Sequence, residues 1–185
     1  MKRRTLLKST GLAITSLAAM NGLSGQVFAA DKPAIKPDTA PLSDELDKYP
    51  RCVICNMDRR KFHFSRHLLH YADSHAEGTC SINCASEAML RERKRGFKAI
   101  YAADFGVAGE PKPLTEASSA TYLIGSSLRA VMSPVSKYAF AQRSAAEAAM
   151  SDAGGQLASF EQAVAASLED YANMLTQKYT KDRES

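Results

Sequence analysis

Residues 79–102, TCSINCASEAMLRERKRGFKAIYA, set the fold of this chain because they encode a strand, a helix and a second strand in succession. Thr79 to Ile82 predicts a short strand, and Asn83 is the expected N-cap of a helix from Cys84 to about Arg95. Gly96 ends that helix, and Phe97 to Ala102 predicts the next strand. Upstream, residues 64–71 are apolar and residues 73–78 are typical of a turn, so the whole segment is a β-β-α-β unit.

The same order of elements follows downstream. Residues 121–125, 138–141 and 157–160 predict strands, and Ser144 with Glu147 predicts the capping box of a helix that ends before Gly154. At an offset of 60 residues, Ser86-Glu87-Ala88 lies over Ala146-Glu147-Ala148, which is a faint internal duplication. We expect an α+β fold of two small β-β-α-β units packed side by side, at about residues 52–105 and 118–162.

A C-terminal helix is expected at residues 160–180, after a capping pair formed by Ser159 and Gln162. An apolar stripe at helical spacing runs along it, and we interpret this stripe as core packing; its residues are Val164, Leu168, Tyr171 and Leu175.

Residues 1–29 read as a signal peptide of the twin-arginine (Tat) type. Arg3 and Arg4 precede a weakly apolar run, and Val27-Phe28-Ala29 offers small residues for cleavage after Ala29. No cysteine lies near that cut, so no stable membrane anchor is expected after cleavage. Residues 30–49 carry several prolines and predict an extended linker, followed by one metal-binding domain at residues 50–180. These features predict export to the periplasm.

The formal charge of +4 comes from the leader, which holds four of the 24 basic residues and none of the 20 acidic ones. The remaining chain is balanced at 20 basic and 20 acidic residues, so charge does not support a nucleic-acid partner.

All four cysteines and all four histidines lie between residues 52 and 84. Cys52-x-x-Cys55 and Cys80-x3-Cys84 can form two disulfides or a zinc site of four thiolates, and both possibilities stay open from the spacing alone. Met57, two residues after Cys55, adds nothing to either arrangement but is a favoured donor to Cu(I). We therefore expect Cu(I), with zinc as the alternative metal.

A thiol-based oxidoreductase or heavy-metal-handling protein is a further alternative. It requires a cysteine of low pKa beside an acid or base, and Asp58 is the nearest such group. Cys52-x-x-Cys55 does not begin an evident helix, and no hydrolase triad, phosphate loop or dinucleotide motif is present. We predict that the chain is not an enzyme and has no catalytic residues.

Among the histidines, His67 is a candidate metal ligand. On a helix, His63, His67 and His70 would share one face, whereas on a strand only His63 and His67 would do so. The flanking aromatic residues favour a strand.

The segments CVICNM, GTCSINC and residues 120–162 resemble, in order, the landmarks of the NosL family of copper accessory proteins for nitrous oxide reductase. The resemblance covers roughly residues 50–165. It implies that Cys55 and Met57 belong to a metal loop and that Met132 is a third ligand, with Cys52, Cys80 and Cys84 as secondary candidates or a supporting disulfide. It also implies the fold of two β-β-α-β halves expected above.

The resemblance implies a periplasmic Cu(I) metallochaperone that delivers copper by ligand exchange to a cuproenzyme such as nitrous oxide reductase. Two features depart from the family pattern within the metal site. Asn56 stands where the family has glycine, and asparagine also tolerates a left-handed backbone. Cys80 and Cys84 are additional sulfur, so a site richer in thiolate is expected.

Overall fold

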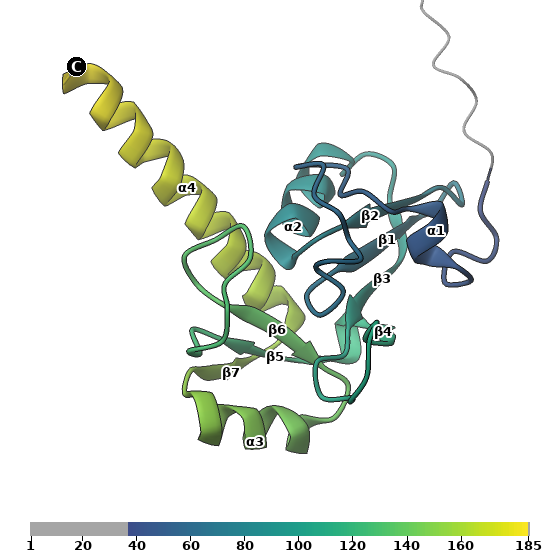
Figure 1. The fold of residues 1–185 in the computed structure, drawn as a ribbon. Coiled ribbons are helices and arrows are strands. Elements are labelled where there is room, and N and C mark those ends of the chain that lie inside the picture. Colours follow the sequence, from purple (N-terminus) through teal and green to yellow (C-terminus); the bar gives the residue numbers. More distant parts are fainter. Residues whose placement is uncertain (1–36, 185) are drawn as a thin grey trace, which may run out of the picture. The chain divides into compact units, whose positions relative to one another are not determined.

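The computed structural model describes residues 37–184, so the predicted signal peptide lies outside the described residues. The described chain contains two antiparallel sheets (Figure 1). The first has the order β2-β1-β3-β4, formed by β1 (His67–Tyr71), β2 (Ala76–Thr79), β3 (Phe97–Ala103) and β4 (Leu114–Glu116). The second has the order β6-β5-β7, formed by β5 (Thr121–Ile124), β6 (Lys137–Phe140) and β7 (Gln156–Ala158).

Helices connect the strands in the predicted order. Helix α2 (Ile82–Arg91) joins β2 to β3, and α3 (Arg143–Ala153) joins β6 to β7. The remaining helices are α1 (Glu45–Lys48), the 3-10 turn η1 (Ala117–Ser119) and the C-terminal α4 (Phe160–Glu184). In each sheet the first strand of a β-β-α-β unit lies between the other two strands of that unit. The predicted α+β fold of two such units with a C-terminal helix is confirmed.

The two units share a buried core. It contains Ile82 from α2, Ala102 from β3, Tyr122 from β5 and Ala163 from α4. Burying a side chain the size of that of Ile82 contributes roughly 1.5–3 kcal/mol. The sheets are also joined through the backbone, because the amide of Phe105 donates to the carbonyl of Ala139 at 2.8 Å.

Several predicted boundaries around α2, the first helix expected from the sequence, are wrong. The strand predicted at Thr79–Ile82 ends at Thr79, so the expected turn at residues 73–78 contains most of β2. The helix runs from Ile82 to Arg91, and its N-cap is Ser81, whose hydroxyl accepts from the amide of Cys84. Asn83, the predicted cap, lies inside the helix, because its side chain is used in a tertiary contact with Lys137.

The second helix also begins earlier than predicted. Helix α3 starts at Arg143, after Gln142, which makes no side-chain capping bond. Instead of the expected capping box with Ser144, Glu147 pairs with Arg143 at 2.9 Å. The predicted capping pair of the last helix is confirmed: the Ser159 amide donates to Gln162 Oε1 at 2.8 Å, and the Gln162 amide donates to Ser159 Oγ at 3.3 Å.

The described part of the predicted linker, residues 37–49, packs against the domain and does not form an extended tether. Glu45 is 6 % exposed and accepts from Arg59 Nη2 at 2.8 Å and from Arg66 Nε at 2.7 Å. Both guanidinium groups are buried, and the Arg59 group also occupies the space above Gly78. A Cβ atom on Gly78 would lie 2.4 Å from Arg59 Cζ, so only glycine fits there.

The stripe predicted as core packing on the last helix is only partly buried. Val164 and Tyr171 are half-buried, but Leu168 and Leu175 are 38 % and 62 % exposed. The prediction fails at Leu175 because the C-terminal half of α4 extends beyond α2, against which its first half packs (Figure 1). Within residues 37–184, no helix combines the length and the apolar character needed to cross a bilayer.

Candidate metal centre

The loop at residues 52–57 closes on itself and is attached to the first sheet. The amide of Cys52 donates to the carbonyl of Met57, and the amide of Asn56 donates to the carbonyl of Cys52, both at 2.9 Å. Asn56 has a φ of 60°, the left-handed conformation that asparagine tolerates better than most residues. The amide of Val53 donates to the carbonyl of Gly78 at 2.9 Å, so the loop lies beside the end of β2.

The second pair of thiols comes from the turn between β2 and α2. Cys80 directly follows β2, and Cys84 lies in the first turn of α2, as the sequence predicted. Ser65 Oγ donates to the carbonyl of Cys80 at 2.8 Å, which fixes the backbone of this turn. The end of β2 therefore places this pair next to the loop that carries Cys52 and Cys55.

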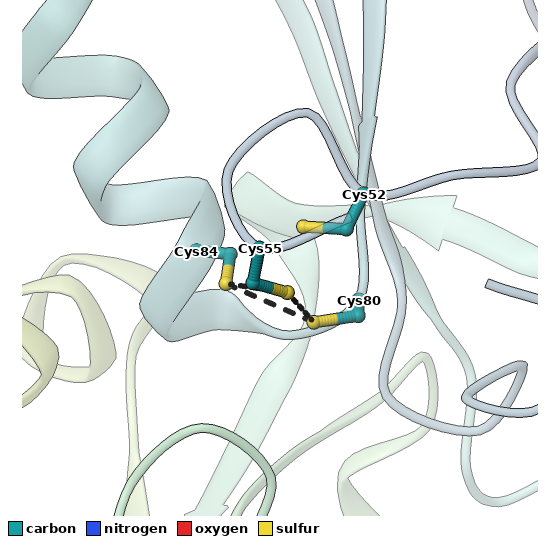
Figure 2. A group of neighbouring side chains, drawn as sticks. All are labelled: Cys52, Cys55, Cys80 and Cys84. Carbon is teal, nitrogen blue, oxygen red and sulfur yellow. Dashed lines mark hydrogen bonds between the residues drawn. The ribbon is translucent and has the colours of Figure 1, made fainter. Parts of the chain in front are cut away.

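All four thiol groups converge, as Figure 2 shows. Cys55 Sγ lies 3.4 Å from Cys80 Sγ, Cys80 Sγ lies 3.7 Å from Cys84 Sγ, and Cys84 Sγ lies 3.8 Å from Cys55 Sγ. When Cys52 Sγ is included, all four sulfur atoms lie within 4.8 Å of one another. These separations exceed a disulfide bond of about 2.05 Å, and the four cysteines are free thiols.

The sulfur separations match those of a shared metal ion. With metal–sulfur bonds of about 2.3 Å, a tetrahedral ion separates its ligands by about 3.8 Å and a trigonal ion by about 4.0 Å. The observed 3.4–3.8 Å triangle of Cys55, Cys80 and Cys84 is close to the tetrahedral separation and somewhat tighter than the trigonal one. The cluster therefore fits a thiophilic metal ion without a large movement of the backbone.

Burial and mutual hydrogen bonding control the charge of the cluster. Cys52, Cys80 and Cys84 are at most 2 % exposed, and only Cys55 is partly accessible. Hydrogen bonds from the Cys80 and Cys84 thiols lower the pKa of Cys52, whereas hydrogen bonding to Cys52 and burial raise the pKa of Cys80 and of Cys84. One thiolate thus forms readily, and further thiolates require a compensating cation.

The wall around the thiols is apolar, and Met57 belongs to it. Val131 is buried against the cysteines, and the half-buried side chains of Ile54, Met57, Phe62 and Phe64 pack on the same cluster. The predicted proximity of Met57 to the thiols is therefore observed. An apolar wall excludes water, which strengthens the attraction between thiolates and a bound cation.

Met132 lies next to this wall but is not part of it. Its neighbour Val131 contacts the cluster, whereas the Met132 side chain is 41 % exposed and its backbone has a φ of 57°. The structure thus places the loop with Met132 beside the thiols while the side chain faces solvent.

His67 is not brought into the cluster, because both of its ring nitrogens have other partners. Nδ1 lies 3.0 Å from the Ser65 carbonyl, and Nε2 lies 3.1 Å from the Tyr122 hydroxyl. The residue is on β1 as predicted, but 2 % exposed in the interior. It joins the two units through Tyr122 and offers no free nitrogen to a metal.

Acidification is expected to destabilise the fold through His67. Burial, with the nearby Arg59 and Arg66, lowers the pKa of His67 from 6.5 to about 4. The unfolded chain therefore takes up a proton at this residue as pH falls below 6.5, and the folded chain does so only near pH 4. Stability from the neutral ring is complete above pH 6.5 and is lost toward pH 4, by about 3 kcal/mol.

Urea unfolding at pH 7, 5.5 and 4 checks this expectation when wild type is compared with His67→Gln. The variant is expected to show a shallower loss of stability, while His75→Gln, in the β1–β2 turn, keeps the wild-type slope. Equal slopes in wild type and His67→Gln would contradict the assignment.

The sequence did not indicate the residues that α4 brings to the site. Tyr171 approaches the first turn of α2: burial, a hydrogen bond to Glu87 and the neighbouring Cys84 raise the pKa of its hydroxyl. These contacts join segments more than 80 residues apart, and no local pattern predicts them.

A sequence model of the family described as NosL matches residues 43–168. Two solved structures are similar to the chain. The crystal structure of the copper chaperone NosL from Shewanella denitrificans has a TM-score of 0.48 and 21 % identity, over 60 % of this chain and 87 % of that one. The solution structure of the apo-NosL protein from Achromobacter cycloclastes has a TM-score of 0.37 and 23 % identity, over 51 % and 82 %. No curated protein sequence matches the chain significantly.

Proposed function

Because the chain belongs to the NosL family, we propose that it binds copper as Cu(I) and delivers it to a copper-dependent enzyme. The observation that carries this proposal is the convergence of four free thiols, with Met57 packed against them. Thiolate and thioether sulfur are the donors that favour Cu(I) over hard ions. Copper is the cargo of this site, and the protein acts as an accessory protein without a catalytic reaction.

Delivery proceeds by exchange of ligands at the accessible side of the cluster. Three thiols are buried and only Cys55 is partly exposed, so a donor of the recipient approaches at Cys55. Cu(I) is held by two or three sulfur atoms, and an incoming ligand binds before a protein ligand leaves. We propose that these two or three donors are drawn from the thiolates of Cys55, Cys80 and Cys84 and the thioethers of Met57 and Met132, with Cys52 beside them.

The recipient and the compartment follow from the family resemblance and the leader. A cuproenzyme such as nitrous oxide reductase is the proposed recipient. Export by the Tat pathway to the periplasm is proposed from residues 1–29, which lie outside the described residues.

A structural zinc site is the second candidate. The geometry of the thiols favours it as strongly as it favours a copper site. Four thiolates with sulfur separations near 3.8 Å are the arrangement of a zinc staple. A thioredoxin-like activity has less support, because residues 52–57 form a turned loop with no helix after the first thiol. The hydrogen bond of the Asp58 side chain goes to the backbone and not to a cysteine: its Oδ1 accepts from the amide of Arg60 at 2.9 Å.

The substitution Met57→Leu distinguishes a Cu(I) site from a structural zinc site. Leucine keeps the volume and apolar contacts of Met57 but removes its sulfur donor. We expect the affinity for Cu(I) to fall about tenfold, while the affinity for Zn²⁺ is unchanged. The measurement is anaerobic competition of the reduced protein with a chromophoric Cu(I) chelator and, separately, with a Zn²⁺ chelator.

Met150→Leu is the matched control, since Met150 is also half-buried but packs on the core of the second unit. It is expected to leave both affinities unchanged. A wild-type protein with high affinity for Zn²⁺ and none for Cu(I) would overturn the proposed function and leave the zinc staple.

A further inference from the structure

A buried ammonium group joins three elements beside the metal centre. Lys137 is the first residue of β6, and its side chain is 1 % exposed. Its Nζ forms an ion pair with Asp170 on α4 and donates to Ser133 Oγ at 3.1 Å and to Asn83 Oδ1 at 3.3 Å. A buried charge with this many partners is costly to displace, because any other position leaves it unpaired.

Ser133 fixes the connection between β5 and β6, residues 125–136. Its hydroxyl donates to the Asp170 carboxylate and accepts from the amide of Val135 at 3.0 Å. The two residues before it are Val131, which packs on the thiols, and Met132, whose side chain is 41 % exposed. Ser133, which is bonded to Asp170, is therefore the sequence neighbour of Met132, the thioether of this loop.

The other side of the network reaches the helix end that carries Cys84. Asn83, which accepts from Lys137, precedes Cys84 in the first turn of α2. Ser167 on α4 also donates to Asn83 Oδ1 at 3.3 Å. The same polar network thus fixes both the helix end that carries Cys84 and the loop that carries Met132.

We propose that Ser133, Lys137 and Asp170 form a latch that holds the 125–136 loop beside the thiol cluster and so controls how fast Cu(I) leaves. The proposal rests on the proposed function, with Met132 as a thioether donor. Met132 must turn toward the thiols to bind, and an anchored neighbour limits how far the loop can move away. Restricting the loop reduces the entropy that is lost when Met132 binds, which strengthens metal retention.

Ser133→Ala tests the latch with little disturbance, because it removes one hydroxyl and leaves the Lys137–Asp170 pair intact. We expect Cu(I) to transfer to excess bathocuproine disulfonate about fivefold faster, the effect of one hydrogen bond. In a Met132→Leu background, Ser133→Ala is expected to cause no further acceleration, because the latch acts through Met132. Ser133→Thr, which keeps the hydroxyl, is expected to transfer at close to the wild-type rate.

Ser126→Ala is the matched control. Ser126 lies on the same loop, and its hydroxyl is bonded to Ser136 Oγ at 2.9 Å without touching Lys137 or Asp170. Its transfer rate is expected to stay within twofold of wild type. An equal acceleration in Ser126→Ala, or an acceleration by Ser133→Ala that persists without Met132, would overturn the latch.

The two proposals fail in different ways. A reduced wild-type protein that binds no Cu(I) refutes the proposed function and the latch together. A wild type that binds Cu(I), with a Ser133→Ala variant that releases it at the same rate, refutes the latch alone.

Discussion

Cys80→Ser is expected to bind Cu(I) at least about 100-fold more weakly than the wild type. Cys80 Sγ lies within 3.4 Å of Cys55 Sγ and 3.7 Å of Cys84 Sγ, and its side chain is fully buried. Serine preserves the size and the turn but replaces a soft donor by a hard one, which Cu(I) binds poorly. The loss exceeds the 10–100-fold effect of altering groups that only orient a ligand.

The measurement is anaerobic competition with a Cu(I) chromophoric chelator of the fully reduced protein. Ser86→Ala is a suitable control, since Ser86 is buried on α2, the helix that follows Cys80, and its hydroxyl has no hydrogen-bond partner within the described residues. Its affinity is expected to equal that of the wild type. If Cys80→Ser bound Cu(I) within threefold of wild type, Cys80 would not be a ligand.

Glu45→Gln is expected to lower the free energy of unfolding by about 3–5 kcal/mol. Glu45 is the only acidic partner recorded in the described chain for Arg59 and Arg66, whose side chains are 0 % and 4 % exposed. The amide keeps the shape but leaves two buried guanidinium groups without a counter-charge. Breaking a buried ion pair by removing one partner costs this much because the other charge stays buried.

Urea unfolding of the reduced protein measures this loss, and Asp47→Asn provides the comparison. Asp47 lies on the same short helix as Glu45 and pairs with Arg60, but both side chains of that pair are about half exposed or more. An exposed pair contributes at most about 1 kcal/mol, so Asp47→Asn is expected to have a small effect. Equal losses in the two variants would show that burial of the Glu45 network contributes nothing to its strength.

The fold was predictable where local signals and tertiary contacts agree. The capping pair of Ser159 with Gln162 is used in the structure as the sequence indicates. Gly96, the predicted helix stop, has a φ of 74° but lies four residues beyond the C-cap, Glu92. The N-terminus of α2 was not predictable in the same way. Ser81 and Asn83 are both good caps, and Asn83 lies inside the helix because Lys137 and Ser167, 54 and 84 residues away, occupy its side chain.

The candidate site was also predictable where local spacing decides it and not where tertiary contacts do. The spacing of the cysteines indicated two pairs, and the turn between β2 and α2 places the second pair as expected. Their convergence depends on the attachment of Val53 to Gly78, which is a backbone contact without a sequence signal. The pattern of histidines was misleading, since the polar atoms of His67 serve a contact between the two units.

The segment before the metal loop was predicted least well. Its prolines suggested a linker, but Glu45 is the counter-charge of Arg59 and Arg66, which lie 14 and 21 residues further along the chain. A single acidic residue in a polar segment does not reveal that its partners are buried. Only the folded arrangement shows that residues 38–48 belong to the domain.

The two β-β-α-β units differ in the length of their hairpins, and they therefore contribute differently to the thiol cluster. The first hairpin turns in four residues, 72–75, whereas the second is connected by twelve, 125–136. The longer one reaches across to the other unit and supplies Val131 to a cluster whose four thiols all come from that unit. One copy of the motif thus supplies the four thiols and the other supplies a side chain that covers them, so separating the two copies would expose the thiols to solvent.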